Sequence, residues 1–295
     1  MLSIVVIFHN MRREARRTLH SLSTAYQRGV HAEQYEVIAV DNGSSRPLDA
    51  DLVKKQGPNF RYHFHATDSV SPAEAVNLGV EMARGEFVAV IVDGARMASP
   101  GLVKTSLQAL AMYRDPVVGA LAWHLGPDVQ NASMLEGYNQ QVEDELLESI
   151  DWPADGYRLF EIAVLAQSSA MGFLGGMPGE LSWLCLRRDT FQRVGGFRPA
   201  FRSKGGGLVN QDIRNRLMMR EGITPLMLLG EGVFHQFHGG VATNVPMAQH
   251  PMREFKAEYQ GIVGTPFRPS PTPQVKYFGT MPEVARRFIN RGPRS

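Results

Sequence analysis

Three short apolar runs constrain the fold more than any other feature of this 295-residue sequence. They span residues 3–8, 35–40 and 87–92, are rich in valine and isoleucine, and stop at turn-forming residues. Such runs are typical of strands that are buried on both faces. A segment with helical apolar spacing follows the first run, and Ser-Pro pairs at Ser71 and Ser99 are typical of helix starts. Alternating strands and helices predict βαβ units around a parallel sheet.

Polar side chains follow each of these runs directly. His9 and Asn10 follow the first run, Asp41 the second and Asp93 the third. The carboxyl ends of parallel strands share one edge of a sheet, where open α/β folds bind ligands. We therefore expect Asp41 and Asp93 to be neighbours in a cleft that His9 and Asn10 also line. Each aspartate has a simpler interpretation as a turn residue that hydrogen-bonds its own loop.

Composition and charge narrow the class of protein. A net charge of +2 and 43% hydrophobic residues are typical of a soluble globular protein and give no case for nucleic-acid binding. The single cysteine, Cys185, excludes an intramolecular disulfide and lies in an apolar run that predicts burial. No apolar run approaches the roughly 18–20 residues that span a bilayer, and a strand at residue 3 leaves no room for a cleaved signal peptide. We expect a cytoplasmic protein.

The second half of the chain is less regular. Residues 183–187 are strand-like, whereas the Glu-rich residues 131–152 predict an exposed helix or a lid. Three consecutive glycines at 205–207 predict the hinge of a lid. Five prolines within residues 264–282 exclude regular structure for most of that stretch. A last short helix is expected over residues 283–291.

Taken together, four motifs resemble those of family 2 glycosyltransferases of the GT-A fold. Residues 40–45 resemble the element V-D-[DN]-G-S-x, and residues 73–86, which include Asn77, resemble A-x-N-x-G…A-x-G. Residues 93–95 occupy the place of the D-x-D motif. Residues 187–197 resemble the segment R-R-x-x-F-x-x-V-G-G-F. The order and spacing of the motifs make the resemblance specific.

The resemblance covers about residues 3–240 and implies a fold and a domain organisation. The implied fold is a Rossmann-like, mostly parallel α/β sheet flanked by helices. A catalytic domain would span residues 1–240, with a nucleotide-sugar half at about 1–125 and an acceptor half at about 126–240. A Pro-rich extension with a short terminal helix would follow over residues 241–295. The implied activity is inverting transfer of a sugar from a nucleoside diphosphate sugar, with UDP favoured, to an acceptor hydroxyl.

The resemblance also implies roles for individual residues. Asp41 would contact the nucleotide base, and Asp93 the ribose or a divalent metal, Mn²⁺ or Mg²⁺. His238, or His235, would complete the metal site. Without a metal, Arg96, Arg202 and Lys204 would neutralise the diphosphate. The full donor-site set comprises His9, Asn10, Asp41, Asn77, Asp93, Gly94, Ala95, Arg96 and Trp183.

Two departures from the family pattern affect the chemistry. Ala95 replaces the last aspartate of D-x-D and cannot bind a metal through its side chain. Residues 212–216 fit the motif D-L-x-x-R, which places Val209 and Asn210 where the family carries an E-D pair. Asn210 cannot accept a proton as a carboxylate does, so Asp212 is the predicted base. A helix cap is the alternative role for Asp212.

Two rival functions follow from the same residues. One is a sugar-1-phosphate nucleotidyltransferase, although the expected Gly-rich basic loop is missing after the first strand. The other is a degenerate transferase that binds a nucleotide sugar or glycan without turnover. Expected partners are a nucleotide-sugar donor and a glycan or small-molecule acceptor, with a homo-oligomer as an option. The basic residues near the end predict a solvated helix face or contact with an anionic membrane surface or partner subunit: Arg286, Arg287, Arg291 and Arg294.

Overall fold

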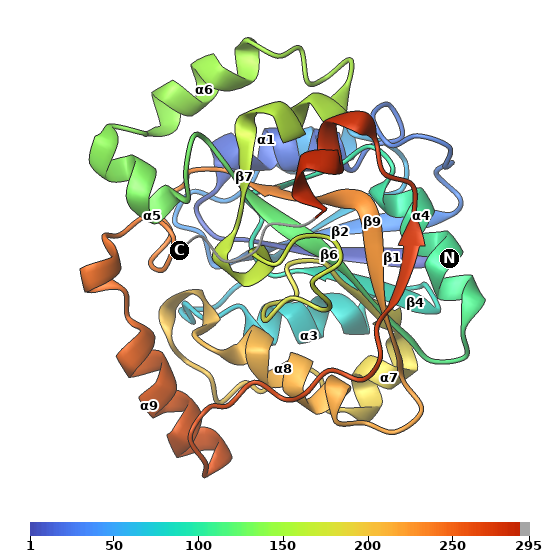
Figure 1. Cartoon of the computed structure of the whole chain (residues 1–295), viewed down its shortest axis with the longest axis vertical. Coiled ribbons are helices and arrows are strands. Elements are labelled where there is room, and N and C mark those ends of the chain that lie inside the picture. The colour runs from blue at the N-terminus through green and yellow to red at the C-terminus, as the bar shows by residue number, and fades with distance from the viewer. Residues whose placement is uncertain (290–295) are drawn as a thin grey trace.

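The computed structural model describes residues 1–289, so Arg291 and Arg294 lie outside the described range. A central sheet is covered by helices on both faces (Figure 1). Helices α1 and α4 (Arg12–Ser21, Leu102–Met112) lie on one face, and α3, α7 and α8 (Ala73–Glu81, Arg188–Arg193, Val209–Met218) lie on the other. This arrangement confirms the predicted α/β fold with flanking helices.

The predicted strands of the first half are all present. They are β1 (Leu2–Phe8), β2 (Tyr35–Asn42) and β4 (Phe87–Ile91). The strand β3 (Phe60–His65) was not predicted, because its sequence FRYHFH alternates aromatic and polar residues and lacks the continuous apolar run of the other strands; only its first residue is buried. The remaining elements of this half are α2 (Ala50–Lys54), β5 (Arg96–Ala98) and β6 (Pro116–Leu125).

The second half adds strands that are less evident in the sequence. The strand β8 (Leu184–Arg187) was expected, whereas the 12-residue β9 (Thr224–His235) was not. The predicted last helix is a short 3-10 helix, Glu283–Phe288. The other elements are α5 (Gln130–Ser133), α6 (Gln140–Glu148), β7 (Ala163–Leu165), α9 (Met252–Val263) and β10 (Lys276–Gly279). None of the helices within residues 1–289 combines the length and apolar character needed to cross a membrane.

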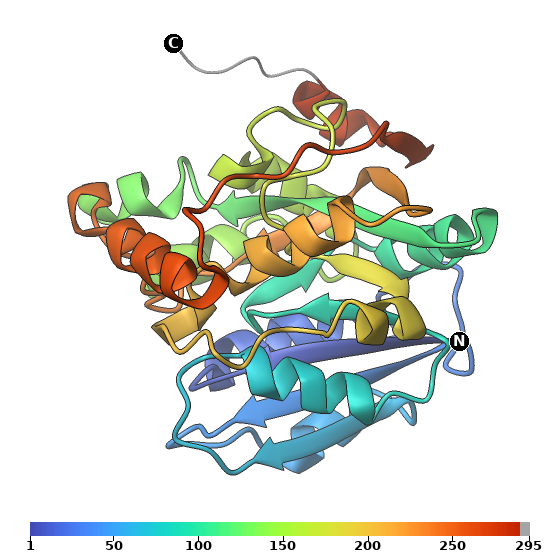
Figure 2. The same ribbon diagram turned by 90° about the horizontal axis from the view of Figure 1, so that it is seen from below.

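The strands form one mostly parallel sheet in the order β10-β9-β6-β8-β4-β1-β2-β3. Figure 2 shows this order, from the blue N-terminal strands at the bottom to β10 at the top. The strand β8 runs antiparallel to both β4 and β6, and the short β5 and β7 pair antiparallel to β9 and β6. The strand β10, which lies in the predicted Pro-rich extension, pairs with β9 and so joins the same sheet.

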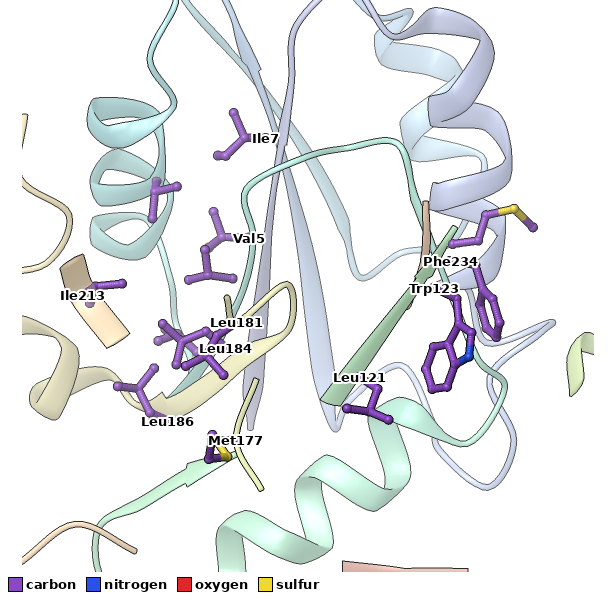
Figure 3. Packing of buried hydrophobic residues seen from close by; sticks show 14 of the residues in the cluster. Val5, Ile7, Leu121, Trp123, Met177, Leu181, Leu184, Leu186, Ile213 and Phe234 are labelled. Atoms are coloured by element: carbon purple, nitrogen blue, oxygen red, sulfur yellow. The ribbon is translucent and has the colours of Figure 1, made fainter. Parts of the chain in front are cut away.

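Side chains of β1 alternate between two apolar layers, as the period of a strand requires. Ile4 and Val6 face the layer that contains α1 and α4. Val5 and Ile7 face the layer that contains α3 and α8, where Figure 3 shows them with Ile213 of α8. Burial of each such side chain contributes about 1.5–3 kcal/mol. Both faces are therefore packed, and ligands can approach the sheet only at its edges.

The helix α6 lies within the Glu-rich stretch predicted to be an exposed helix or a lid. The helix is present, but Glu143 on it is fully buried. Its carboxylate accepts a hydrogen bond from the Phe237 backbone N–H at 2.7 Å and pairs with Arg13 of α1 at 3.3 Å. Asp144 pairs with Arg13 at 2.5 Å and also with Arg17. Ion pairs of these acidic residues therefore hold α6 against α1. The prediction that this segment is exposed is wrong for Glu143.

Candidate functional site

The carboxyl ends of β1, β2 and β4 lie side by side at one edge of the sheet. Phe8 pairs in register with Asp41, and Val6 pairs with Ile91. The backbone N–H of Gly94 donates to the carbonyl oxygen of Ile7 at 2.7 Å. The structure therefore brings the polar residues that follow these strands to one edge, as the sequence predicts.

Asp41 organises the loop that follows β2. Its side chain is fully buried. One carboxylate oxygen accepts from the N–H of Ser44 at 3.0 Å, and the other accepts from the N–H of Leu48 at 2.7 Å. These contacts match the turn interpretation of Asp41. Its contact with a nucleotide base stays a prediction.

Asn10 ties the loop after β1 to the loop after β2. It has a positive φ of 55°, a conformation that asparagine tolerates better than most residues. Its Oδ1 accepts from both N–H and Oγ of Ser45 at 3.0 Å, and its own N–H donates to Ser44 Oγ at 2.7 Å. His9 Nδ1 lies 2.8 Å from the carbonyl oxygen of Asn42. The two loops form one wall at this edge.

Asp93, His235 and His238 bring three ligand atoms together. Asp93 Oδ2 lies 2.8 Å from His235 Nε2 and 3.5 Å from His238 Nε2, and the two Nε2 atoms are 3.1 Å apart. Pairing of β5 with β9 places Arg96 opposite His235 and so brings the end of β9 beside Asp93. A cation bound at about 2.0–2.2 Å needs neighbouring ligand atoms about 3–3.5 Å apart, so these distances fit a metal site.

Gln130 determines which nitrogen of His235 faces Asp93. The Gln130 amide N–H₂ donates to the carbonyl oxygen of His235 at 3.0 Å, so its Oε1 faces His235 Nδ1 at 2.9 Å. An amide oxygen only accepts, so Nδ1 carries the proton and Nε2 presents a lone pair. That lone pair points at a carboxylate oxygen, and a divalent cation between the two acceptors resolves their repulsion. The donor set therefore fits a metal ion.

The charges of the three groups are strongly coupled. Burial lowers the pKa of His235 to about 4, although Asp93 opposes the shift. Burial alone would raise the pKa of Asp93, but the two histidines more than offset it and hold that pKa well below its ordinary value. Burial likewise opposes protonation of His238, and Asp93 outweighs it so that the pKa of His238 is raised. At neutral pH, Asp93 is ionised and His235 is neutral.

Asn244 fixes the loop that carries His238. Its Oδ1 accepts from the backbone N–H groups of His238, Gly239 and Gly240 at 3.3, 2.9 and 2.8 Å. Its amide N–H₂ donates to Gln130 Oε1 at 3.0 Å. One amide network therefore positions both histidines, as outer partners do in established metal sites.

Arg96 lies between Asp93 and a further carboxylate, Glu180. Its Nη2 is 3.9 Å from Asp93 Oδ2 and 3.8 Å from Glu180 Oε1. Arg96 is only 6% exposed, and neither its Nε nor its Nη1 has a hydrogen-bond partner within the part of the chain that the structure describes. A buried guanidinium with unsatisfied N–H groups is suited to an anionic ligand.

Gly94 and Ala95 contribute through their backbones. A side chain at Gly94 would place its Cβ 2.2 Å from the ring of Phe8, so only glycine fits there. The N–H of Ala95 donates to Asp93 Oδ1 at 3.0 Å. The contact leaves the other oxygen, Oδ2, for the histidines.

Asn77 and Trp183 were predicted to line the donor site, but the structure uses both in packing. Asn77 bonds both the N–H and the carbonyl oxygen of Phe197, at 2.9 and 2.7 Å, and so links α3 to the turn after α7. Trp183 is fully buried, and its indole N–H donates to Ser106 of α4 at 3.0 Å. For Trp183, burial against α4 excludes the predicted contact with a ligand.

Asp212, the predicted base, is only 1% exposed. Arg216 binds one of its oxygens through two N–H groups at 2.8 and 2.9 Å, and Arg198 lies 3.4 Å from the other. It does not cap α8 either, because the helix begins at Val209 and has no side-chain cap. The geometry gives Asp212 a structural ion pair.

The glycines at 205–207, which were predicted to form the hinge of a lid, all have positive φ. Arg202, which was predicted to neutralise the diphosphate, is exposed and lies 3.5 Å from Glu74.

Sequence reasoning missed Gln130, Asn244 and Glu180. Each of the two amides has a hydrogen-bond partner more than 100 residues away in the sequence, so no local motif indicates its role. Glu180 directly precedes the apolar run that contains β8, whereas the sequence predicts functional residues where parallel strands end. Its proximity to Arg96 depends on the antiparallel course of β8.

Comparisons with known proteins agree with the motifs. Residues 3–117 match the sequence model of Glycosyl transferase family 2. The matched residues include Asp41, Asp93 and Arg96, whereas His235 and His238 lie beyond them. No curated protein matches the chain.

Three solved structures share the fold at 14% identity. S. aureus TarS has a TM-score of 0.55, with 81% of this chain and 37% of TarS covered. TarS 1–349 in complex with UDP-GlcNAc has a TM-score of 0.53, with 88% and 66% covered. Mannosyltransferase PcManGT from Pyrobaculum calidifontis, in complex with GDP-Man and Mn²⁺, has a TM-score of 0.51, with 92% and 65% covered. The chain thus spans less than two thirds of the length of these proteins.

The comparisons confirm both the GT-A fold and the family resemblance. Residues 3–117 carry the sequence signature of glycosyl transferase family 2, and the chain folds as GT-A glycosyltransferases do.

Proposed function

We propose that this protein transfers a sugar from a nucleoside diphosphate sugar to an acceptor hydroxyl, in one displacement that inverts the anomeric centre. The observation that carries the proposal is the convergence of Asp93, His235 and His238 beside the buried Arg96. This constellation places three ligand atoms for a cation and one guanidinium group at the sheet edge where α/β folds bind nucleotides. The family 2 signature supports the reaction class and the inversion.

Asp93 Oδ2 and the Nε2 atoms of His235 and His238 would hold a divalent cation. When bound, the cation stabilises the negative charge that develops on the leaving diphosphate. Two imidazole ligands suit Mn²⁺ better than Mg²⁺, which prefers oxygen ligands. Arg96 supplies a second, permanent positive charge to the same diphosphate. The loops joined by Asn10 and Ser45 form the wall against which the nucleoside rests.

The donor nucleotide is proposed from the structural neighbours. TarS structures contain UDP or UDP-GlcNAc, and PcManGT contains GDP-Man with Mn²⁺. A UDP-sugar is therefore the first donor to test, and GDP-mannose is the second. The acceptor would be a glycan or a small molecule with a free hydroxyl.

A thermal-shift panel tests donor binding directly. UDP, GDP, CDP and dTDP are each added with and without Mn²⁺ or Mg²⁺. A ligand at 100 times its dissociation constant adds about 2.7 kcal/mol to the free energy of unfolding. We expect one nucleotide to stabilise the protein, with a larger shift when Mn²⁺ is present. Failure of all four nucleotides to shift the melting temperature would refute the proposed donor class.

Turnover separates an enzyme from a protein that only binds the donor. The donor sugar of the stabilising nucleotide is incubated with Mn²⁺, and release of the nucleoside diphosphate is followed with water or added saccharides as acceptor. Release above the protein-free rate supports transfer. Binding without release would instead support the degenerate, non-catalytic alternative.

A further inference from the structure

We infer that Glu180 is the general base that deprotonates the acceptor hydroxyl. The inference rests on the proposed function and assigns a catalytic role to a residue outside the family match. Single-displacement transfer requires one basic group within about 3 Å of the attacking oxygen. That group must be ionised, accessible and close to the leaving diphosphate.

Three other carboxylates that the sequence proposed for function, Asp93, Asp41 and Asp212, are already engaged. Asp93 divides its oxygens between the Ala95 N–H and the histidines. Asp41 is fully buried, and both its oxygens accept from loop N–H groups. Asp212 is buried between two arginines. None of the three presents a free carboxylate edge to an acceptor.

Glu180 meets the requirements that these carboxylates do not. Its side chain is 31% exposed, and its contact is with Arg96 Nη2 at 3.8 Å. Among the described residues, it is the one further carboxylate that ion pairs link to Asp93, through the shared Arg96. The two contacts of Nη2 place the oxygens of Glu180 and Asp93 within about 7.7 Å of each other. This upper limit keeps Glu180 close to the site that would hold the leaving diphosphate, as a base that acts on the attacking oxygen must be.

Asn210 contacts the residue that follows Glu180 in the chain. Its amide N–H₂ donates at 3.2 Å to the carbonyl oxygen of Leu181, the residue after Glu180. Its Oδ1 is buried and finds no partner in residues 1–289. The contact ties the segment that carries Glu180 to α8, and the unsatisfied Oδ1 is suited to accept from a hydroxyl that approaches it.

The chemical step balances without a further reactant. Glu180 takes the proton of the acceptor hydroxyl, and the acceptor oxygen forms a bond to the anomeric carbon. The bond from that carbon to the phosphate oxygen breaks, and the nucleoside diphosphate leaves with the electron pair. The carboxyl proton then passes to water. Arg96, which contacts both Glu180 and Asp93, receives the charge that moves onto the diphosphate.

The test compares Glu180→Gln with wild type in a reaction that needs no known acceptor. UDP-GlcNAc and GDP-mannose are the donors, Mn²⁺ is present, and water is the acceptor. Release of UDP or GDP is measured alongside the dissociation constant of the same nucleoside diphosphate. Glutamine keeps an oxygen beside Arg96 but cannot take a proton. We expect turnover to fall about 10²–10⁴-fold with an unchanged dissociation constant.

Two further variants distinguish a base from an ion-pair partner. Glu180→Asp keeps a carboxylate and should retain more turnover than Glu180→Gln. Glu86→Gln is the matched control, because Glu86 also has one arginine partner, Arg187 at 2.7 Å, but at the opposite end of β4. Its turnover should equal that of wild type.

The outcomes separate the inference from the function on which it rests. Turnover of Glu180→Gln within threefold of wild type overturns the base assignment and leaves the proposed function intact. A fall in turnover matched by an equal loss of nucleotide affinity also overturns it and makes Glu180 a donor-binding residue. If wild type neither binds nor cleaves any donor, the proposed function fails first.

Discussion

Gln130 Oε1 lies 2.9 Å from His235 Nδ1, and this contact determines which imidazole nitrogen faces Asp93. The amide sits on α5, and the histidine ends β9, so two elements far apart in sequence define one ligand atom. Removing the acceptor frees the other tautomer, in which Nε2 carries a proton and cannot bind a cation. The relationship gives the metal site its first quantitative test.

Gln130→Leu should weaken Mn²⁺ binding about 10–100-fold, because leucine fills the space but cannot hold the Nδ1 proton. Isothermal titration calorimetry of the folded variant with Mn²⁺ measures the change. Gln141→Leu, on the exposed side of α6, is the control and should bind Mn²⁺ as wild type does. Equal Mn²⁺ affinity for all three proteins would show that Gln130 does not set the tautomer.

His238→Ala should abolish the extra thermal stabilisation that Mn²⁺ gives to the nucleotide complex, since it removes one of three converging ligand atoms. Differential scanning fluorimetry with nucleotide, with and without Mn²⁺, measures the effect. His31→Ala removes a histidine that lies on the surface and should behave as wild type. A full Mn²⁺ effect in His238→Ala would place the cation elsewhere.

Asp212→Asn should lower the free energy of unfolding by about 3 kcal/mol, because it removes the carboxylate that balances the charge of the largely buried Arg216. Urea denaturation measures the loss. Asp189→Asn is the control, because Asp189 forms an ion pair of the same i,i+4 spacing with Arg193, at 2.7 Å, but at the surface. Its free energy of unfolding should fall by less than about 1 kcal/mol. If Asp212→Asn were as stable as wild type but inactive, Asp212 would be the base after all.

Glu231 should make stability depend on pH. Its side chain is buried, and burial raises its pKa to about 7, although Ser99, Tyr157 and the Gly101 N–H hydrogen-bond it. The folded state therefore binds this proton more tightly than the unfolded state does. Its contribution to stability is fully present below pH 4.5 and is lost as the pH rises to about 7.

The matched variant Glu231→Gln has no such titration. The free energy of unfolding of the variant minus that of wild type should increase from pH 5 to pH 8, by an amount on the order of 2–3 kcal/mol. Urea denaturation at the two pH values measures the difference. Glu283→Gln, at an exposed site, should show no change with pH relative to wild type. A constant difference between Glu231→Gln and wild type would contradict the raised pKa.

The sequence predicted the parts of the fold that depend on local pattern. Strands β1, β2 and β4 are continuous apolar runs because both faces of the sheet are covered. The strand β9 was missed because Gly230, Glu231 and Gly232 interrupt its apolar run. Those three residues serve contacts with distant segments, which no local pattern records.

The sequence predicted the residues of the candidate metal site but not the residues that hydrogen-bond or pair with them. Asp93, His235 and His238 were all proposed for a metal, and the structure brings them together. The role of Asp212 could not be read from spacing, because its pairing with Arg216 and Arg198 depends on which face of α8 is buried. The proximity of Glu180 to Arg96 could not be predicted either, because it depends on the antiparallel pairing of β8 with β4.

The bonds from Asn244 to three successive N–H groups have a consequence for the speed of recognition. The loop around His238 acquires its shape when the chain folds, so its ordering entropy is a cost of folding and not of ligand capture. An arriving ion meets ligands that already stand in place. Association at this centre should therefore follow a single exponential that rises linearly with ion concentration, without the plateau that a slow rearrangement of the loop would impose.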